Sequence, residues 1–336
     1  MKSDRRIPGP GHRRVVVAGL GTVALVFAIT AALLVTGSDP GMLSPLPGRW
    51  NGASEAPSPA GDGIRTFTSD AEITVTENLV YGEQPDGTAL RVDVCSPEGA
   101  APGTAFPAMV SIHAGSWTRG NKAEANWRNV CEWLASEGFV TFAVNYRLAP
   151  EDPFPAGVDD LATAVRWIRQ PAQVERFGID PARIGAFGGS AGANLSAFLG
   201  THGSGPVTEG SRVAAAVELS GPTDLTAEAL VADGSSERLQ RLVRRYVGCM
   251  SLADCPIAED ASPVRHLDPS DPPMFIANST TEFVPLAQAT RLADGLAELG
   301  IAHQLVTPEG EVHSIGFLDA DMRAKIAAFL HEHLGE

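Results

Sequence analysis

One short turn between an apolar strand and a helix limits most strongly what this chain can fold into. The strand-like residues 183–187 run into the turn Gly188-Gly-Ser-Ala-Gly192, and an apolar helical pattern follows. Small residues must flank a serine that is held on a strained strand-to-helix corner, where backbones crowd together. Such a corner holds the Ser190 hydroxyl above a sheet, and the helix that Ala191 opens favours negative charge at its N-terminal amides. The turn therefore predicts an α/β fold with a nucleophilic serine.

The remainder of the chain alternates between strand-like and helix-like stretches. Strands are expected at 73–80, 89–94, 108–112, 139–144, 183–187, 213–219, 274–277 and 302–306, and helices at 123–136, 158–169, after Ser190, at 285–299 and at 319–333. Two opening strands before the alternation predict a mostly parallel central sheet with an antiparallel start, flanked by helices. Between 222 and 263 the pattern breaks, which predicts either a small lid or cap insertion or an irregular helical connection.

A serine nucleophile needs a base to take its proton and an acid to orient that base. In sheets that carry such a serine, the acid follows a later strand and the histidine follows the last one. Glu282 and His313 occupy these two places, and the other histidines lie elsewhere in the pattern. Asp224 is a rival for the acid, because it follows the strand predicted at 213–219, although it also reads as part of a helix cap. We expect Ser190, Glu282 and His313 to form the triad.

The loop after the strand at 108–112 reads His113-Ala-Gly-Ser-Trp117. Its position predicts that the backbone amides of Gly115 and Ser116 converge with that of Ala191 on the oxyanion of a tetrahedral intermediate. His113 and Trp117 have a second interpretation, as packing residues at the end of a strand.

The N-terminal part predicts export or anchoring. A basic segment, 1–14, precedes 21 uncharged positions at 15–35, a length that suits a signal anchor that crosses the membrane with the N-terminus in the cytoplasm. Cleavage after Gly37 as a signal peptide is the alternative. A flexible Pro/Gly/Ser-rich linker at 36–63 then leads to a catalytic domain at 64–336. The domain is therefore expected outside the cytoplasm, either anchored to the cell membrane or secreted.

The four cysteines form an even set in a chain expected to be exported. Cys249 and Cys255 enclose a short loop, which favours a disulfide between them. Cys95 and Cys131 then form the second pair by elimination, unless each is a small buried thiol.

Charge and residue spacing exclude several other classes of function. The chain has 40 acidic against 25 basic residues and a net charge of −15, so nucleic acid is not an expected partner. No spacing of histidines and carboxylates is typical of a metal site, and nothing implies a cofactor. A small-molecule ester is the expected ligand, and the sequence gives no indication of the oligomeric state.

These motifs, taken in their order, resemble the α/β-hydrolases, and specifically the hormone-sensitive-lipase-like and feruloyl-esterase-like carboxylesterases. The resemblance extends from residue 71 to the C-terminus and rests on four features: the loop at 113–117 in place of the family's His-Gly-Gly-Gly-Trp type, Asn145-Tyr-Arg-Leu-Ala-Pro-Glu151, Gly188-Gly-Ser-Ala-Gly192, and the placement of Glu282 and His313. It implies that Tyr146, Arg147 and Asp160 brace the sheet near the site. Two departures are Ala114, where the family has glycine, and Glu282, where aspartate is usual.

The resemblance and the residues together predict a serine carboxylesterase that acts on small or short-chain esters through an acyl-enzyme. An amidase, a peptidase or an acyltransferase would use the same triad. A non-catalytic cell-surface binding domain is the third alternative, because a fold does not fix a function.

Overall fold

The computed structural model describes residues 63–98 and 105–335. All of these residues belong to one compact unit. The predicted basic segment 1–14, the predicted anchor 15–35 and all but the last residue of the predicted linker 36–63 lie outside the described residues. Within 63–98 and 105–335, no helix is both long and apolar enough to cross a membrane.

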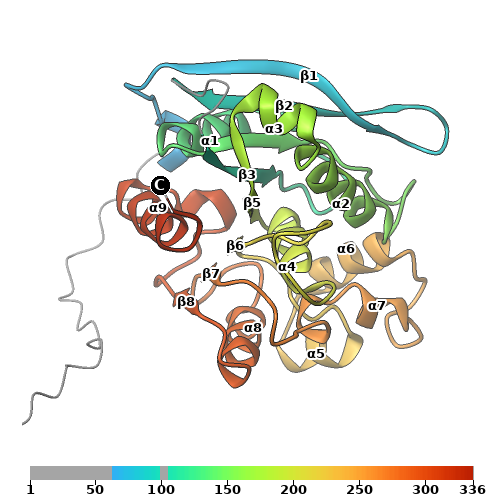
Figure 1. Ribbon diagram of the computed structural model, residues 1–336. Helices are drawn as coiled ribbons and strands as arrows, with labels where there is room; N and C mark the ends of the chain where they lie inside the picture. Colours follow the sequence, from blue (N-terminus) through green and yellow to red (C-terminus); the bar gives the residue numbers. More distant parts are fainter. Residues whose placement is uncertain (1–62, 99–104, 336) are drawn as a thin grey trace, which may run out of the picture. The chain divides into compact units, whose positions relative to one another are not determined.

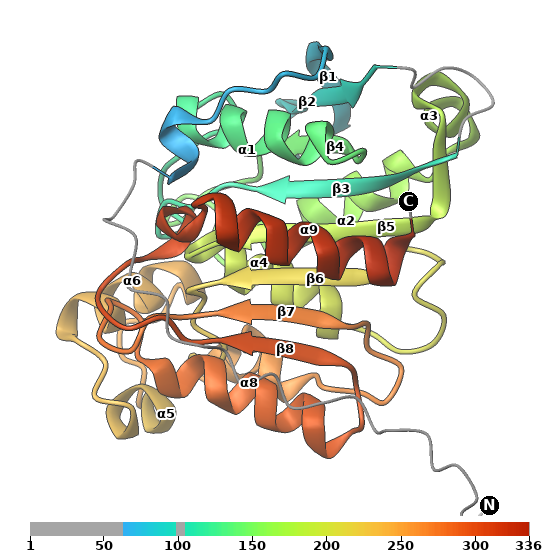
Figure 2. The ribbon, with the colours of Figure 1, turned by 90° about the vertical axis from the view of Figure 1, so that its left-hand side faces the viewer.

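An eight-stranded sheet in the order β1-β2-β4-β3-β5-β6-β7-β8 forms the centre of the fold (Figure 1, Figure 2). Its strands are β1 Ile73–Glu83, β2 Ala89–Pro97, β3 Phe106–Ile112, β4 Val140–Val144, β5 Ile179–Gly189, β6 Ala215–Leu219, β7 Met274–Ala277 and β8 His303–Val306. β1 pairs antiparallel with β2 and β2 with β4, whereas every pair from β4 through β3 to β8 is parallel. The predicted mostly parallel sheet with an antiparallel start is confirmed.

Helices cover both faces of this sheet (Figure 1). On one face lie α1 Ala125–Ser136 and α9 Ala320–Leu334, which pack on the inward side chains of β3, β5, β6 and β7 in one apolar cluster. The other face carries α2 Ala156–Ile168, α4 Ala191–Thr201 and α8 Leu286–Glu298. Apolar burial on both faces explains why β4, β6 and β7 are buried along their whole length, as parallel strands usually are.

The segment at 222–263, which the sequence left as either a cap or an irregular connection, folds into three helices. They are α5 Ala227–Ala232, α6 Glu237–Val247 and α7 Ile257–Asp260. In Figure 2, α5 and α6 lie on the side toward which the arrowheads of β6 and β7 point, which is the carboxyl edge of the sheet. The sequence did not predict α3 Pro171–Phe177, although proline at its start and Gly178 in the left-handed conformation at its end are both recognisable helix signals.

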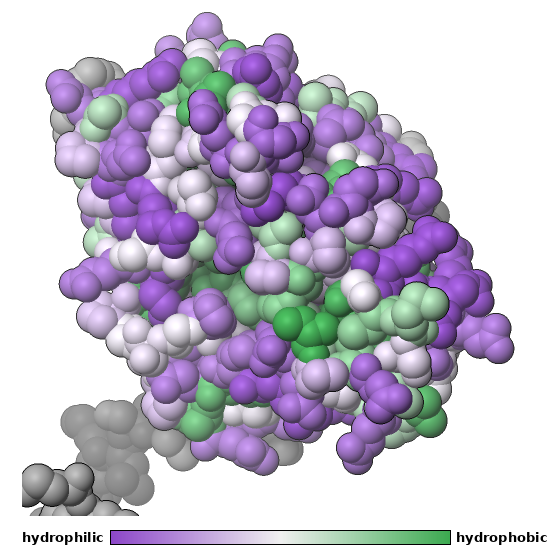
Figure 3. Space-filling model, turned by 90° about the vertical axis from the view of Figure 1, so that its right-hand side faces the viewer, coloured by the Kyte–Doolittle hydropathy of each residue, from purple (hydrophilic) through white to green (hydrophobic). Residues whose placement is uncertain are grey.

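The face that carries α2, α4, α6 and α7 is mostly hydrophilic, with a group of apolar side chains near its middle (Figure 3). Between α2 and α4 lies a cavity of about 210 Å³ that Phe154, Phe198 and His202 help to line. The 97% exposed Met250 belongs to the loop after α6, which the Cys249–Cys255 disulfide closes.

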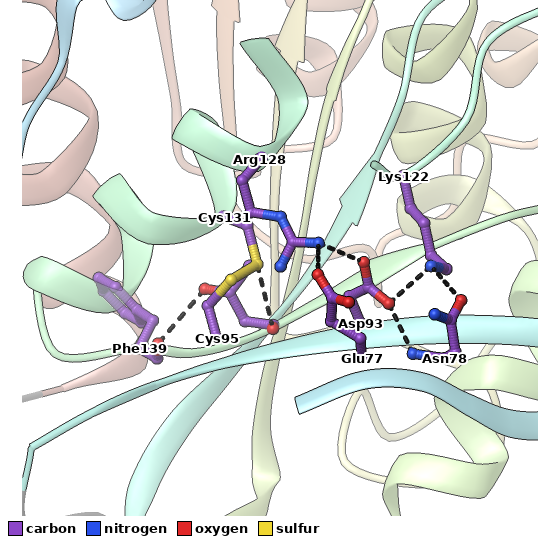
Figure 4. The surroundings of a disulfide bond; sticks show 9 residues. Glu77, Asn78, Asp93, Cys95, Lys122, Arg128, Cys131 and Phe139 are labelled. Atoms are coloured by element: carbon purple, nitrogen blue, oxygen red, sulfur yellow. Dashed lines mark hydrogen bonds and ion pairs between the residues drawn. A yellow bond between two sulfur atoms is a disulfide. The ribbon is translucent and has the colours of Figure 1, made fainter. Parts of the chain in front are cut away.

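A second disulfide, Cys95–Cys131, joins β2 to α1 (Figure 4). The structure thus pairs all four cysteines, and the alternative of two buried thiols is wrong. Beside it the buried Asp93 accepts hydrogen bonds from Lys122 Nζ at 2.6 Å and from Arg128 at 2.7 Å. Because Lys122 lies between β3 and α1, this ion pair fixes the far end of the loop that starts at the carboxyl edge of β3.

Candidate active site

Ser190 lies at the corner between β5 and α4, in a backbone conformation that few side chains adopt. Its φ is 54°, and its amide donates to the carbonyl oxygen of Leu219 at 2.8 Å. A Cβ at Gly188 would lie 2.0 Å from the carbonyl oxygen of Gly192, and a Cβ at Gly192 would lie 2.1 Å from that of Ile112. Both positions therefore require glycine. The Ser190 hydroxyl is partly exposed and makes no hydrogen bond to the described residues.

Glu282 follows β7, His313 follows β8, and their side chains are in direct contact. His313 Nδ1 donates a hydrogen bond to Glu282 Oε2. The Glu282 side chain is fully buried, whereas that of His313 is 30% exposed. Because the carboxylate accepts the Nδ1–H hydrogen bond, the proton of a neutral His313 ring stays on Nδ1 and Nε2 is free as an acceptor. This is the tautomer that a general base needs.

Hydrogen bonds also hold the second oxygen of Glu282. Glu282 Oε1 accepts from Ser220 Oγ at 2.7 Å and from the amide of Ser279 at 3.0 Å. Ser220 Oγ in turn accepts from the amide of Ser314 at 2.8 Å. One hydroxyl therefore connects the loop that carries the acid to the loop that carries the histidine. Ser220 directly follows β6, and Ser279 follows β7 after one intervening residue. A polar residue after a strand is the only signal for them in the sequence.

Close packing between chain neighbours brings the serine corner against the histidine loop. A Cβ at Gly189 would lie 2.2 Å from Ser314 Oγ. Gly189 precedes Ser190 and Ser314 follows His313, so the predicted nucleophile and base stand on segments that touch. Their hydroxyl and imidazole form no hydrogen bond here, and such bonds are often long before a substrate is present.

The loop after β3 turns through three consecutive residues with positive φ. These angles are 131° at Gly115, 55° at Ser116 and 58° at Trp117, and Ala114 is not among the positive-φ residues. The alanine that replaces the family's glycine therefore needs no unusual backbone. Among the described residues, the amides of Gly115, Ser116 and Ala191 donate to no acceptor. Unpaired amides are available to a developing negative charge.

Backbone strain is concentrated around this site. Six non-glycine residues with positive φ occur among the described residues, and five of them are Ser116, Trp117, Ser190, Ser220 and Ser314. Such conformations cost about 1–3 kcal/mol each and persist only where the surroundings enforce them. Backbone strain is thus concentrated at the edge of the sheet where the candidate site lies.

His113 and Trp117, at the two ends of the segment 113–117, are both buried. The buried His113 ring stacks on Tyr146 at 4.4 Å, and Tyr146 donates to the His113 carbonyl at 2.9 Å. Burial lowers the pKa of His113 to about 4, so this ring is neutral. Trp117 stacks on Tyr246 of α6 at 4.4 Å, and its indole donates to Asn194 of α4 at 3.1 Å. These contacts agree with the packing interpretation of both residues.

Asp224, the rival acid, has other partners. Its carboxylate accepts from Arg265 at 2.9 Å and from the Thr226 hydroxyl at 2.7 Å. Glu282 holds the Nδ1 of His313, so Asp224 does not orient the histidine.

A second buried carboxyl, which the sequence analysis did not single out, lies in β6 below the site. Glu218 is fully buried, its Oε1 accepts from the amide of Gly221, and its Oε2 has no partner among the described residues. Burial raises the pKa of Glu218 well above its usual range, and the nearby Glu282 raises it further. Burial and the neighbouring Glu282 therefore both favour the protonated form of the Glu218 carboxyl.

Comparisons with known proteins agree on one group of enzymes. The BD-FAE family profile matches residues 92–296. The probable carboxylic ester hydrolase LipM of Mycobacterium tuberculosis is 30% identical over 70% of this chain and 53% of its own length, and the esterase LipQ of the same organism is 26% identical over 75% and 60%. The chain thus spans little more than half the length of these two relatives.

The match to solved structures extends over a larger share of the related protein. A thermophilic esterase from Thermogutta terrifontis superposes with a TM-score of 0.62 at 28% identity, covering 78% of this chain and 92% of that protein. A family profile that matches more than half of the chain, together with the shared fold, identifies the chain as an α/β-hydrolase of the BD-FAE family.

Proposed function

We propose that the protein is a serine carboxylesterase that hydrolyses small or short-chain carboxylic esters through an acyl-enzyme. Ser190 is the nucleophile, His313 the general base and acid, and Glu282 the residue that orients His313. The amides of Gly115, Ser116 and Ala191 bind the oxyanion.

The reaction proceeds in two stages. Ser190 Oγ attacks the ester carbonyl carbon while His313 Nε2 takes its proton, and the negative charge develops on the carbonyl oxygen near the three unpaired amides. As the intermediate collapses, the bond to the alcohol oxygen breaks, and His313 gives the alcohol its proton. Water then attacks the acyl-enzyme, His313 takes the water proton, and the acid product leaves with the Ser190 hydroxyl restored.

The observation that carries this proposal is the Glu282–His313 hydrogen bond beside the Ser190 corner. A bond to Nδ1 fixes the ring in the tautomer that can accept the serine proton. The relatives are named as a probable carboxylic ester hydrolase and as esterases, which supports the same reaction class.

Hydrolysis of 4-nitrophenyl acetate and butyrate by the full-length protein tests the proposal. Ser190→Ala should lower kcat at least about 10⁴-fold, because the nucleophile is lost. Ser196→Ala is the matched control, since Ser196 is a buried serine of α4 whose hydroxyl has no partner among the described residues. A folded protein without turnover on either ester, or equal activity in wild type and Ser190→Ala, would refute the proposal.

We further propose that the domain lies outside the cytoplasm. Two disulfides support this location, because disulfides persist in oxidising compartments. Protease treatment of intact cells should degrade the domain, and its full protection would contradict the proposed location.

A further inference from the structure

Helix α6 is unusually basic for this chain. Within its 11 residues it holds four arginines and one acidic residue, whereas the chain as a whole carries a net charge of −15. Its apolar side, which includes Leu239, Val243 and Tyr246, is buried against the body of the domain. Tyr246 stacks on Trp117 of the loop after β3, which fixes α6 beside the site. The arginines on the other side of the helix are Arg238, Arg241, Arg244 and Arg245.

One of these arginines reaches the candidate catalytic histidine through a single aromatic ring. The Arg238 guanidinium carbon lies 5.2 Å from the centre of the Phe283 ring. The Phe283 ring meets the His313 ring edge to face, with 5.9 Å between their centres. Phe283 therefore contacts both the Arg238 guanidinium and the His313 ring, and the contact with Phe283 limits where the guanidinium can move.

No acidic side chain of the described residues neutralises Arg238. Its neighbour Glu237 pairs with Arg241 at 3.5 Å, and the carboxylate of Glu282 is buried and bound to His313. Arg238 also lies in the first turn of α6, where the helix dipole is positive and an acidic residue would be more stable. A positive charge at this position destabilises the helix, but together with the helix dipole it attracts an anion more strongly.

Resting on the proposed function, we propose that Arg238 binds a carboxylate carried by the substrate, so that the site prefers anionic esters to neutral esters of the same size. The planar guanidinium can donate two parallel hydrogen bonds to a carboxylate while Phe283 covers one of its faces. The substrate then spans the site, with its ester carbonyl at Ser190 and its carboxylate at the start of α6. In this arrangement the carboxylate takes no part in the chemical step.

Matched pairs of substrates measure the preference. On the acyl side, the mono-4-nitrophenyl esters of adipate and suberate are compared with 4-nitrophenyl hexanoate and octanoate. On the alcohol side, the butyrate ester of 4-hydroxybenzoate is compared with phenyl butyrate. Each pair differs in one carboxylate, so the ratio of kcat/KM for the anionic over the neutral ester reports recognition of the charge, and the two arms show which part of the ester carries it.

Three full-length variants identify the residue that recognises the charge. Arg238→Gln should lower the ratio about tenfold in at least one arm, through KM of the anionic ester, and leave kcat/KM of the neutral ester unchanged. Arg238→Lys keeps the charge without the planar fork and should retain part of the preference. Arg245→Gln is the matched control, because it removes the same charge from an exposed position on α6 that does not contact Phe283.

A ratio that is unchanged in Arg238→Gln, or lowered equally in Arg245→Gln, would overturn the proposal. Calorimetry with adipic acid monoanilide and with hexananilide in a Ser190→Ala background gives the same comparison without turnover. The monoanilide should bind about tenfold more tightly than hexananilide only where Arg238 is present. If the wild type hydrolyses none of these esters, the proposed function is refuted. If the two anilides bind equally, the recognition of charge is refuted, so the two failures are distinguishable.

Discussion

Ser220 offers the sharpest test of how the candidate site is held together. Its hydroxyl donates to Glu282 Oε1 at 2.7 Å and accepts from the amide of Ser314 at 2.8 Å. Ser220→Ala removes both bonds without changing the backbone requirement, because serine and alanine meet the same strain at a φ of 62°. The variant therefore releases Glu282 from one support and leaves one buried amide without a partner.

The size of the effect follows from these two bonds. A hydrogen bond to a charged group contributes about 1.5–3 kcal/mol, and an unpaired buried donor costs about 1–3 kcal/mol. We expect a loss of stability of about 2 kcal/mol and, because His313 loses a fixed partner, a 10- to 100-fold decrease in kcat, which corresponds to about 1.4–2.7 kcal/mol of barrier. Ser220 is fully buried and does not face a substrate, so KM should change by less than about twofold.

Steady-state hydrolysis of 4-nitrophenyl butyrate and thermal unfolding measure the two effects. Ser314→Ala is the matched control, because the Ser314 hydroxyl is buried, has no partner among the described residues and belongs to a residue with a φ of 60°. Removing an unpaired hydroxyl is nearly neutral, so this variant should keep kcat within about twofold. Ser220→Gly relieves the strain and should lose as much kcat as Ser220→Ala.

Two results would refute the reasoning about Ser220. The first is a kcat in Ser220→Ala that stays within about twofold of wild type. The second is an equal decrease in Ser220→Ala and Ser314→Ala, which would assign the loss to general disturbance of the loop.

Three other predictions concern charge and covalent structure. Burial raises the pKa of Glu218, so the folded state keeps a proton that the unfolded chain releases above its usual pKa of 4.5, and stability falls as pH rises from there toward the raised pKa. Glu218→Gln removes this penalty, so the Tm difference between variant and wild type should grow as the pH rises above about 4.5, and a constant difference would contradict the assignment. Glu282→Gln should lower kcat about 10³- to 10⁴-fold while Asp224→Asn stays within about threefold, and the reverse order in steady-state assays would make Asp224 the acid. Replacing Cys95 and Cys131 by alanine opens a loop with a sequence separation of 36 and should lower the free energy of unfolding in urea by about 4 kcal/mol. Removing the Cys249–Cys255 disulfide, with a separation of 6, should lower it by about 2 kcal/mol. Equal losses would argue against the chain-entropy origin of this difference.

Local signals predicted most of the architecture. The alternation of apolar strands and amphipathic helices gave the order of the elements, and glycines at 188 and 192 mark a corner where any side chain would collide with backbone. Placement after strands also predicted which glutamate and histidine the structure brings together, because the carboxyl ends of parallel strands meet at one edge.

Long-range contacts account for what the sequence did not reveal. Ser220 is separated by 62 residues from Glu282 and by 94 from Ser314, so no local pattern distinguishes it from any serine after a strand. In the sequence Glu218 looks like an ordinary strand residue, and only the packed structure reveals that it is fully buried. The contact between Arg238 and Phe283 likewise depends on how α6 packs at the carboxyl edge of the sheet. Sequence periodicity predicts elements, whereas these roles depend on how the elements are packed together.

The corner at Ser190 also has a consequence for directed evolution. At a φ of 54° glycine is the residue that the backbone favours, so Ser190→Gly should raise the melting temperature while it removes the proposed nucleophile. A library screened for heat resistance alone would therefore enrich inactive clones at this codon. Any programme to make the protein more durable has to select for turnover in the same round.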